Sequence, residues 1–359
     1  MAWAMLCLAL STLGLGLAVT AHEPGIILFD APGAGPGAGQ GTMPVGIIAG
    51  GAIVGYYVDA GNVNHGFLRA PDGTVTNIDV PGAGTSAYQG TAAYGMNPAG
   101  ATTGGYTDAR GVAHGFLCSP QGTFTRFDAP GATGTEGDSI NPAGWIAGVW
   151  WDAGGAYHGL VSAPDGKITE FDAPGAGRGW GEGTEPAAFC GINPVGEVTG
   201  YYADADHVYH SFLRAPDGEL TTFEAPGAGT AGWGQGTYAL CINPAGAITG
   251  VYTDASYVSH GFLRAPDGTF TNFDAPGARS ITMPTCNNPA GTITGEYWDA
   301  SDVIHGFWRT PNGKFATFSV RRAGTAARQG TIPEAINPEG AITGEYLDAH
   351  GAYHGFLMP

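Results

Sequence analysis

The residues most able to do chemistry are aspartates and histidines that recur in register along the chain. A His-Gly-Phe tripeptide, or a near variant such as His-Ser-Phe, occurs seven times, and an aspartate stands six positions before each histidine. Carboxylate and imidazole together could bind a metal ion or act as general base and acid. The pairs are Asp59/His65, Asp108/His114, Asp152/His158, Asp204/His210, Asp254/His260, Asp299/His305 and Asp348/His354.

A structural role explains seven copies better than a catalytic one, because a site that is needed once does not require seven copies. We expect each aspartate to cap the loop that follows it and to accept a hydrogen bond from its own histidine. The sequence therefore predicts no catalytic residue and no metal ligand among these pairs.

Residues that break the repeat are better candidates for a specific site, since function is usually placed on loops. The glycine-rich segments between repeats carry three aromatic residues shortly before the glycine that opens the next repeat, and a glutamine or glutamate directly before that glycine. Aromatic faces beside hydrogen-bonding groups suit a neutral glycan or a peptide. The predicted ligand-binding residues are Tyr88, Gln89, Trp180, Glu182, Trp233 and Gln235. The alternative is that the tryptophans only fill gaps between repeats.

An enzyme would need a non-repeated cluster of acids and bases. The candidates are Glu136, Asp138, Glu182, Glu185 and Glu334, which are scattered over three repeats of the sequence. No G-x-S-x-G elbow and no lysine-containing phosphate loop occurs. We expect no cofactor. Calcium stays an alternative because of the acidity, although the sequence contains no D-x-D-x-D-G loop.

The spacing within the repeat indicates which elements position these residues. From the Asn position of I-N-P-x-G to the histidine is 17 residues in all seven copies, and from that histidine to the next acidic position is 14. Only the stretch from the acidic position to the next Asn position varies, and it opens with Ala-Pro-Gly-Ala-Gly. Hairpin loops set strand register and cannot vary freely. We therefore expect the variable stretch to link packed units and the other connections to be hairpins.

Each unit then holds four short strands, exemplified by 236–243, 248–254, 259–264 and 270–274, which alternate with Asn-Pro and Pro-Asp-Gly turns. Four strands every 44–52 residues predict an all-β, seven-bladed β-propeller with four antiparallel strands per blade. Residues 26–30 supply a fourth strand and 353–358 a third strand, so we expect these two to pair and close the ring. A parallel β-helix is the alternative fold. Four tryptophans in strands, Trp150, Trp151, Trp298 and Trp308, are expected in the core.

The first residues have the features of a secretory signal peptide. An uncharged apolar run over 3–19 is followed by Val-Thr-Ala, which is typical of a signal peptide over residues 1–21. An uncleaved membrane anchor is the alternative. The remaining chain, 22–359, is predicted to be one secreted or cell-surface domain without a further membrane segment. Cys190, Cys241 and Cys286 fall at matching or adjacent positions of neighbouring repeats, and the sequence leaves open whether two of them form a disulfide.

Composition limits the partners. The chain has 359 residues and a net charge of −18, with 13 Lys and Arg against 31 Asp and Glu. Such a protein repels nucleic acids and anionic membranes, so we expect no nucleic-acid partner. The predicted partner is an extracellular glycan or protein, and self-association of the discs is also open.

The repeat resembles the HAF-type repeat of bacterial extracellular proteins, named for a His-Ala-Phe core beside an I-N-x-x-G-x-x-x-G stretch. Here the core is mostly His-Gly-Phe and once His210-Ser211-Phe212, and the resemblance covers about residues 26–359. It implies an exported, propeller-like protein and carries no catalytic residues. Together with the loop residues, this favours a non-enzymatic binder of an extracellular ligand. A propeller lyase or hydrolase acting on polysaccharide or peptide, and a self-associating surface protein, are the alternatives.

Overall fold

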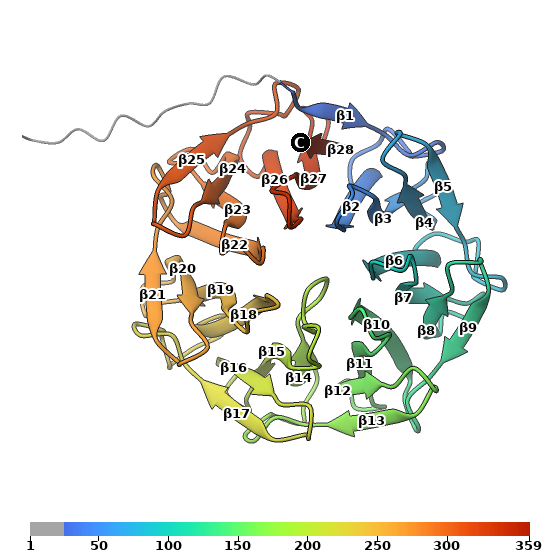
Figure 1. The fold of residues 1–359 in the computed structure, drawn as a ribbon, viewed down its shortest axis with the longest axis horizontal. Coiled ribbons are helices and arrows are strands. Elements are labelled where there is room, and N and C mark those ends of the chain that lie inside the picture. Colours follow the sequence, from blue (N-terminus) through green and yellow to red (C-terminus); the bar gives the residue numbers. More distant parts are fainter. Residues whose placement is uncertain (1–24) are drawn as a thin grey trace, which may run out of the picture.

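The described part of the chain consists of strands joined by turns and loops. The computed structural model describes residues 25–359, so the predicted signal peptide over 1–21 lies outside the described residues. This part holds 28 strands and no helix. Within the same range, no helical segment is long and apolar enough to cross a membrane. The strands form one closed ring, a propeller arrangement in which short strands stack outward from a central axis (Figure 1).

Strands nearest the axis and those that follow them form the inner half of the ring (Figure 1). The innermost strands are β2 (Gly41–Ile47), β6 (Gly90–Met96), β10 (Gly134–Ile140), β14 (Gly183–Pro186), β18 (Gly236–Ile242), β22 (Ile281–Asn287) and β26 (Gly330–Ile336). The second strands are β3 (Ile53–Val58), β7 (Thr102–Thr107), β11 (Ile146–Trp151), β15 (Val198–Ala203), β19 (Ile248–Thr253), β23 (Ile293–Trp298) and β27 (Ile342–Leu347).

The outer half repeats the same pattern. The third strands, which carry the repeated histidines, are β4 (Asn64–Arg69), β8 (Ala113–Cys118), β12 (Tyr157–Ser162), β16 (Tyr209–Arg214), β20 (Ser259–Arg264), β24 (Ile304–Arg309) and β28 (Tyr353–Met358). The outermost strands are β1 (Ile27–Phe29), β5 (Val75–Ile78), β9 (Phe124–Phe127), β13 (Ile168–Phe171), β17 (Leu220–Phe223), β21 (Phe270–Phe273) and β25 (Phe315–Phe318).

Neighbouring strands within a group of four are antiparallel, as in β18–β19–β20–β21. Consecutive groups are joined by single parallel pairs such as Tyr209 with Gly236. A side chain on Gly236 would overlap the backbone of Tyr209, which explains why glycine opens most innermost strands. The first described strand, β1, pairs with β28, with Ile27 opposite Leu357, so these two strands close the ring as the sequence predicts.

The repeated apolar residues form the core of each group. The phenylalanine of His-Gly-Phe is fully buried, as at Phe262, and so is the first residue of the Ile-Thr-Gly stretch, as at Ile248. Gly250 of that stretch lies under the ring, where an added methyl group would overlap Phe262 and the carbonyl oxygen of Tyr238. The alternation of large and absent side chains therefore lets successive strands pack closely.

Asparagines of the Asn-Pro turns hold neighbouring groups together. The Oδ1 atom of Asn243 accepts hydrogen bonds from the backbone of its own turn, and its Nδ2 donates to the carbonyl of Asn288, 3.1 Å away, in the next group. The turn role follows from the sequence, whereas the bond between groups does not. Asn193 donates instead to Glu197, and at that step of the ring a disulfide joins Cys190 to Cys241.

One innermost strand is interrupted, and this corrects an expectation about chain length. Gly183 to Asn193 spans 10 positions, whereas Gly236 to Asn243 spans 7. The three extra residues therefore lie after β14, inside a group, and not in the variable linker as the spacing suggested. β14 has four residues where the other innermost strands have seven, and the segment that follows it projects toward the centre of the ring (Figure 1).

Candidate functional site

The linkers and the loops between second and third strands lie together on one face of the ring. The amide of Gly35 in the first linker donates to the carbonyl of Val58 at the end of β3, at 2.8 Å, and that of Gly39 donates to Gly351 in another such loop, at 2.9 Å. We call this face the linker face. All six predicted ligand-binding residues lie on its linkers, so their placement depends on how each linker is held.

Three of the six use their polar groups to hold the linker itself. The side-chain oxygens of Gln89 and Gln235 accept backbone amides of Ser86 and Ala231, and Glu182 accepts the amide of Gly179 at 2.7 Å. Gln235 is only 4% exposed. These groups therefore close linker turns, and the polar ring expected around the aromatic residues is largely occupied by backbone.

The three aromatic residues are exposed but belong to separate places on the face. Tyr88, Trp180 and Trp233 are 81%, 77% and 60% exposed. Trp233 stacks on His207 with ring centres 4.1 Å apart, while Trp180 covers Gly155, where an added side chain would overlap the indole. Of the three, Trp180 alone lines the cavity described next.

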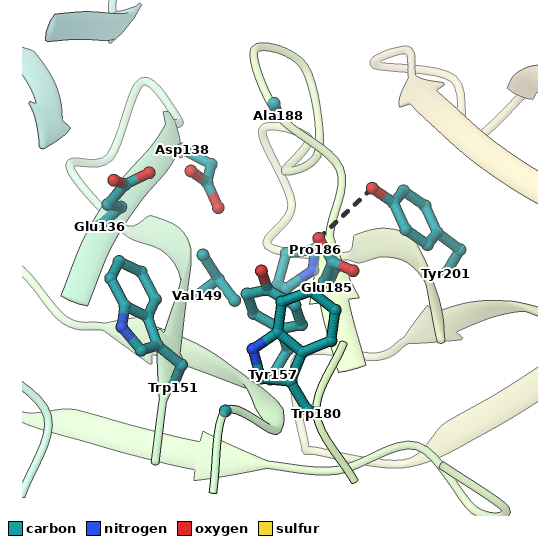
Figure 2. A pocket seen from close by; sticks show the side chains of 11 residues that line it. Glu136, Asp138, Val149, Trp151, Tyr157, Trp180, Glu185, Pro186, Ala188 and Tyr201 are labelled. Atoms are coloured by element: carbon teal, nitrogen blue, oxygen red, sulfur yellow. Dashed lines mark hydrogen bonds between the residues drawn. The ribbon is translucent and has the colours of Figure 1, made fainter. Parts of the chain in front are cut away.

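A cavity of about 460 Å³ opens beside Trp180, between the group that begins with β10 and the group that begins with β14 (Figure 2). The cavity lies where the shortened β14 ends and a loop begins. Ala188 of this loop lines the cavity. The residues that line it are Glu136, Asp138, Val149, Trp151, Gly155, Tyr157, Trp180, Glu185, Pro186, Ala188 and Tyr201. Its volume lies in the range of small-ligand sites.

A β-bulge helps to place the acidic wall. The register between β10 and β11 shifts between Gly137 and Ser139, so Asp138 is the extra residue of the bulge. Bulges re-aim a side chain, and the carboxyl of Asp138 lines the cavity together with that of Glu136 (Figure 2). Glu185 reaches the same cavity from β14 and accepts a long hydrogen bond of 3.4 Å from the hydroxyl of Tyr201.

The three carboxyl groups have pKa values above their ordinary range. Burial raises the pKa of Glu185 to about 7 and also raises the pKa of Glu136. Burial, and secondarily the charges of Glu136 and Glu185, raise the pKa of Asp138 well above its usual value. No hydrogen bond to the Asp138 carboxyl occurs among residues 25–359, and the cavity lining contains no basic residue. Near neutral pH Glu185 can therefore exchange a proton.

This convergence overturns the expectation that the acidic candidates are scattered. Glu136, Asp138 and Glu185 meet in one cavity, whereas Glu182 closes a linker turn. The sequence holds the signal: Glu136 and Glu185 occupy the same place, two residues after the glycine that opens an innermost strand. Neighbouring innermost strands meet at the axis, so equal positions in successive repeats approach each other.

Glu334 belongs to a second acidic cluster that was not predicted from the sequence. It occupies the bulge of β26, and its neighbours Glu296 and Glu345 occupy the variable place of Ile-Thr-Gly-x-Tyr in β23 and β27. Burial first, and the charge of Glu296 second, raise the pKa of Glu334 to about 8. Trp298 donates to Glu296 at 3.1 Å. Glu345 Oε2 is buried and has no hydrogen-bond partner within the described range.

Three cysteines meet near the axis at the opposite end. Cys190 and Cys241 form a disulfide, and Cys286 is a free, buried thiol whose sulfur lies 3.6 Å from that of Cys241. They line a cavity of about 200 Å³ together with Glu334 and residues of the Asn-Pro turns. Within residues 25–359, this trio is the only set of three or more His, Cys, Asp or Glu side chains whose possible metal-ligand atoms all lie within 4.8 Å of one another.

The repeated Asp and His side chains stay apart, one pair per group, and each aspartate caps its loop as expected. Asp254 Oδ1 accepts the amides of Ser256 and Val258 at 2.8 and 2.9 Å. The same carboxylate position makes the same pair of bonds at Asp59, Asp108, Asp152, Asp204, Asp299 and Asp348. The capping role predicted from the sequence is therefore present in all seven groups.

The expected hydrogen bond from each histidine to its own aspartate is wrong for five of the seven pairs. Only two histidines make it: Nε2 of His210 lies 3.2 Å from Asp204, and Nε2 of His305 lies 3.1 Å from Asp299. In the other five pairs the distance from Nε2 to the aspartate is 3.6–3.8 Å, too long for a hydrogen bond. These five histidines are His65, His114, His158, His260 and His354.

The physical reason is that the imidazole is held from its other nitrogen, by the residue 14 positions later on the outermost strand or just after it. Two of these contacts depart from the common form. Nδ1 of His305 lies 2.8 Å from the hydroxyl of Ser319, which stands where the other repeats have an acid. Nδ1 of His354 lies 3.0 Å from Asp30, which comes from the opposite end of the chain. The remaining Nδ1 contacts are His65 with Asp79, His114 with Asp128, His158 with Asp172, His210 with Glu224 and His260 with Asp274.

The constant spacing of 14 residues from each histidine to this partner is the signal for the contact in the sequence, and it indicates a hairpin as well. Each imidazole also packs against the aromatic ring of the second strand, as His260 does on Tyr252. His114 differs from the other copies because it is buried, at 2% exposure. Among the described residues, its Nε2 has no hydrogen-bond partner, as is also true of His158. The histidines thus tie the third strand of each group to the outermost strand, which is a structural role with a different partner from the one expected.

The tryptophans expected in the core lie at its edge. Trp150, Trp151, Trp298 and Trp308 are all partly exposed. Trp150 stacks on the ring of His158 at 4.1 Å, and Trp151 packs against Gly134 and lines the acidic cavity. Alternation of side chains along a strand indicates which face of the sheet a residue lies on. It does not indicate whether that face is covered by other residues, so the strand position of these tryptophans did not predict their exposure.

Comparison with known proteins identifies the fold. No protein-family model matches the chain, and no curated protein sequence matches it. A streptogramin B lyase structure is similar at a TM-score of 0.59 and 15% identity, over 93% of this chain and 98% of that one. Virginiamycin B lyase from Staphylococcus aureus is similar at 0.60 and 15%, over 93% and 99%. A fungal lectin with a six-bladed β-propeller fold is similar at 0.44 and 12%, over 80% and 96%. At these identities the likeness concerns the propeller fold alone.

Proposed function

We propose that the protein is an exported, seven-bladed β-propeller that binds an extracellular glycan in the acidic, tryptophan-lined cavity of its linker face. Each antiparallel group of four strands would be one blade, with β26, β27 and β28 completed by β1. The antiparallel pairings within each group and the pairing of β1 with β28 support this count. Export and membership of the HAF-type repeat family are part of the same proposal.

The observation that carries the binding proposal is the combination found in one cavity. Trp180 and Trp151 offer flat apolar faces, and the carboxyl groups of Glu136, Asp138 and Glu185 offer hydrogen-bonding oxygens that linker backbone does not use. Sugars present apolar faces on their rings and hydroxyl groups around the rim, so they need both kinds of contact. Tyr88 and Trp233 do not line this cavity. The proposed site is therefore at one place on the ring, beside Trp180.

A matched pair of variants tests the site. Trp180→Ala should weaken binding to a glycan identified on an array by at least about tenfold. Trp233→Ala removes an exposed tryptophan from the equivalent linker of the next repeat and should leave the affinity unchanged. Equal effects of the two substitutions, or no effect of Trp180→Ala, would show that the ligand does not use this cavity.

A lyase or hydrolase acting on polysaccharide or peptide is the second candidate, favoured by the same three carboxyl groups. A carboxylic acid with a pKa near neutrality can donate a proton and then accept one, and burial brings Glu185 into that range. Incubating the bound glycan with the protein and analysing it by mass spectrometry separates the two candidates. An intact glycan supports a binder, whereas fragments that disappear with Glu185→Gln support an enzyme.

A further inference from the structure

We infer that the ligand of the linker-face cavity is a glycan that contains amino sugars with free, protonated amino groups. This inference rests on the proposed function of the same cavity and specifies the chemical class of its ligand. It follows from the charge of the wall, from one buried side chain without a partner, and from the size and shape of the space.

The charge of the wall selects a cation. The eleven lining residues include Glu136, Asp138 and Glu185 and no lysine, arginine or histidine. The whole chain carries a net charge of −18, so the long-range field has the same sign as the wall. A ligand with sulfate, phosphate or uronate groups would be repelled, while a protonated amine would gain an opposite charge in a site partly removed from water.

Asp138 is the most buried of the three acidic residues that line the cavity. It is 6% exposed, its carboxyl lines the cavity (Figure 2), and no donor among residues 25–359 reaches that carboxyl. Buried polar groups are normally hydrogen-bonded, and an ammonium group would supply up to three donors. Glu185 receives only the long bond from Tyr201, so it retains acceptor capacity as well.

The spacing of the carboxyl groups fits a group larger than a metal ion. Their oxygens do not all lie within 4.8 Å of one another, because the cysteine trio is the only described set that meets that limit. A bound calcium ion holds its oxygens about 2.3–2.6 Å from itself, so most pairs of them lie closer together than this. A cavity of about 460 Å³ instead has room for sugar rings that carry several donors to separate acceptors.

The tryptophans favour a sugar over a lysine side chain. Trp180, 77% exposed, covers Gly155 at the mouth of the cavity, and Trp151 lies on the wall below Glu136 in Figure 2. A sugar ring can lie flat on an indole while its amine approaches a carboxylate, and the indole face also attracts the cation. A lysine side chain has no flat ring to match these faces.

The test compares ligands that differ only in the amine. Fully N-acetylated glucosamine oligomers and the same oligomers with free amines would be titrated into the full chain by calorimetry, in low-salt buffer near neutral pH. The free-amine oligomer should bind at least about tenfold more tightly. Asp138→Asn keeps the shape of the side chain and should reduce that preference to near parity. Glu219→Gln removes an equal charge from an exposed position and should preserve it.

The outcomes separate this inference from the proposed function. Equal or tighter binding of the acetylated oligomer overturns the amine preference and leaves a glycan-binding cavity. Binding of neither oligomer, together with negative results on a wider glycan array, overturns the glycan function itself. If trilysine binds as tightly as the free-amine oligomer, the glycan class is wrong. If Asp138→Asn fails to fold, Glu136→Gln serves in its place, and an unchanged preference in a folded variant overturns the inference.

Discussion

The buried carboxyl of Glu185 makes the stability of the protein depend on pH, and its replacement by glutamine should remove that dependence. Burial raises the pKa of Glu185 from 4.5 to about 7, which corresponds to about 3 kcal/mol of preference for the protonated form in the folded state. The folded protein therefore holds this proton more tightly than the unfolded chain does. Stability is unaffected below about pH 4.5, falls as the pH rises toward about 7, and stays reduced above it.

Glu185→Gln keeps the shape of the side chain and cannot ionise. The variant should match the natural protein near pH 4 and exceed its free energy of unfolding by about 3 kcal/mol near pH 8. Urea unfolding followed by tryptophan fluorescence over this pH range measures the difference. Glu170→Gln replaces an exposed carboxylate on β13 and should show no such trend.

Two results would refute this reasoning. One is a difference between Glu185→Gln and the natural protein that stays constant with pH, which would mean that the carboxyl is effectively solvated. The other is a variant that is less stable above pH 7, which would mean that the ionised carboxylate has a favourable partner. Either result would remove the argument that the cavity wall holds carboxyl groups in need of a ligand.

Three further substitutions test other parts of the structure. His260→Ala should lower the free energy of unfolding by about 1–2 kcal/mol without changing ligand affinity, because the ring makes a hydrogen bond and an aromatic stack. Cys190→Ser should cost up to about 4 kcal/mol, since the disulfide spans 51 residues, and peptide mapping should find Cys190 bonded in the natural protein. Gly155→Val should weaken glycan binding at least about tenfold, because the added side chain displaces Trp180.

The histidine and glycine substitutions each have a control in the same chain. His350→Ala removes an exposed histidine that is not one of the seven repeated histidines, and it should leave melting unchanged. Unchanged melting for His260→Ala as well would contradict the structural interpretation of the repeated pairs. Gly111→Val is the control for Gly155→Val. Gly111 has the same position in its loop and a similar positive φ, and the space around it is open. Equal loss of binding in both glycine variants would assign the effect to backbone strain. For the cysteines, isolation of a peptide with a Cys241–Cys286 disulfide would contradict the predicted Cys190–Cys241 bond.

Most of the fold could be predicted from the sequence because the repeat constrains it many times over. Constant spacing fixed the hairpins, and turn residues such as Asn243 marked their ends. The unmatched terminal strands predicted that residues 26–30 pair with 353–358, and the structure shows this pairing with Ile27 opposite Leu357. The one error of organisation came from measuring repeat 4 to Asn193, which merged an insertion after β14 with the preceding linker. A count from Gly183 would have located it.

The partners of the repeated histidines show where spacing alone is ambiguous. Both the aspartate six positions before each histidine and the acid 14 positions after it recur in register, so either could have been the partner. Oδ1 of Asp254 accepts two loop amides, which orients that carboxylate, and the imidazole of His260 meets Asp274 instead. Choosing between the two acids requires the antiparallel pairing of β20 with β21, which places Phe273 opposite Gly261 and brings the acid beside the ring.

The site was harder to predict because it breaks the pattern that reveals the fold. Exposed aromatic residues on linkers suggested Trp180 and Trp233 equally, and the sequence does not indicate that only one borders a cavity. The positions of Glu136 and Glu185 were visible in the sequence, but their approach depends on neighbouring innermost strands meeting at the axis. Asp138 depends in addition on a bulge, which no turn residue marks.

A crystal structure of the protein with a bound amino-sugar oligomer tests the central claim most directly. The account predicts electron density for a sugar ring against Trp180 and for its amino group within hydrogen-bond distance of the Asp138 carboxyl. Density on Trp233, among the cysteines at the opposite end of the axis, or on the outer edge of the ring, with the acidic cavity occupied only by water, would contradict it.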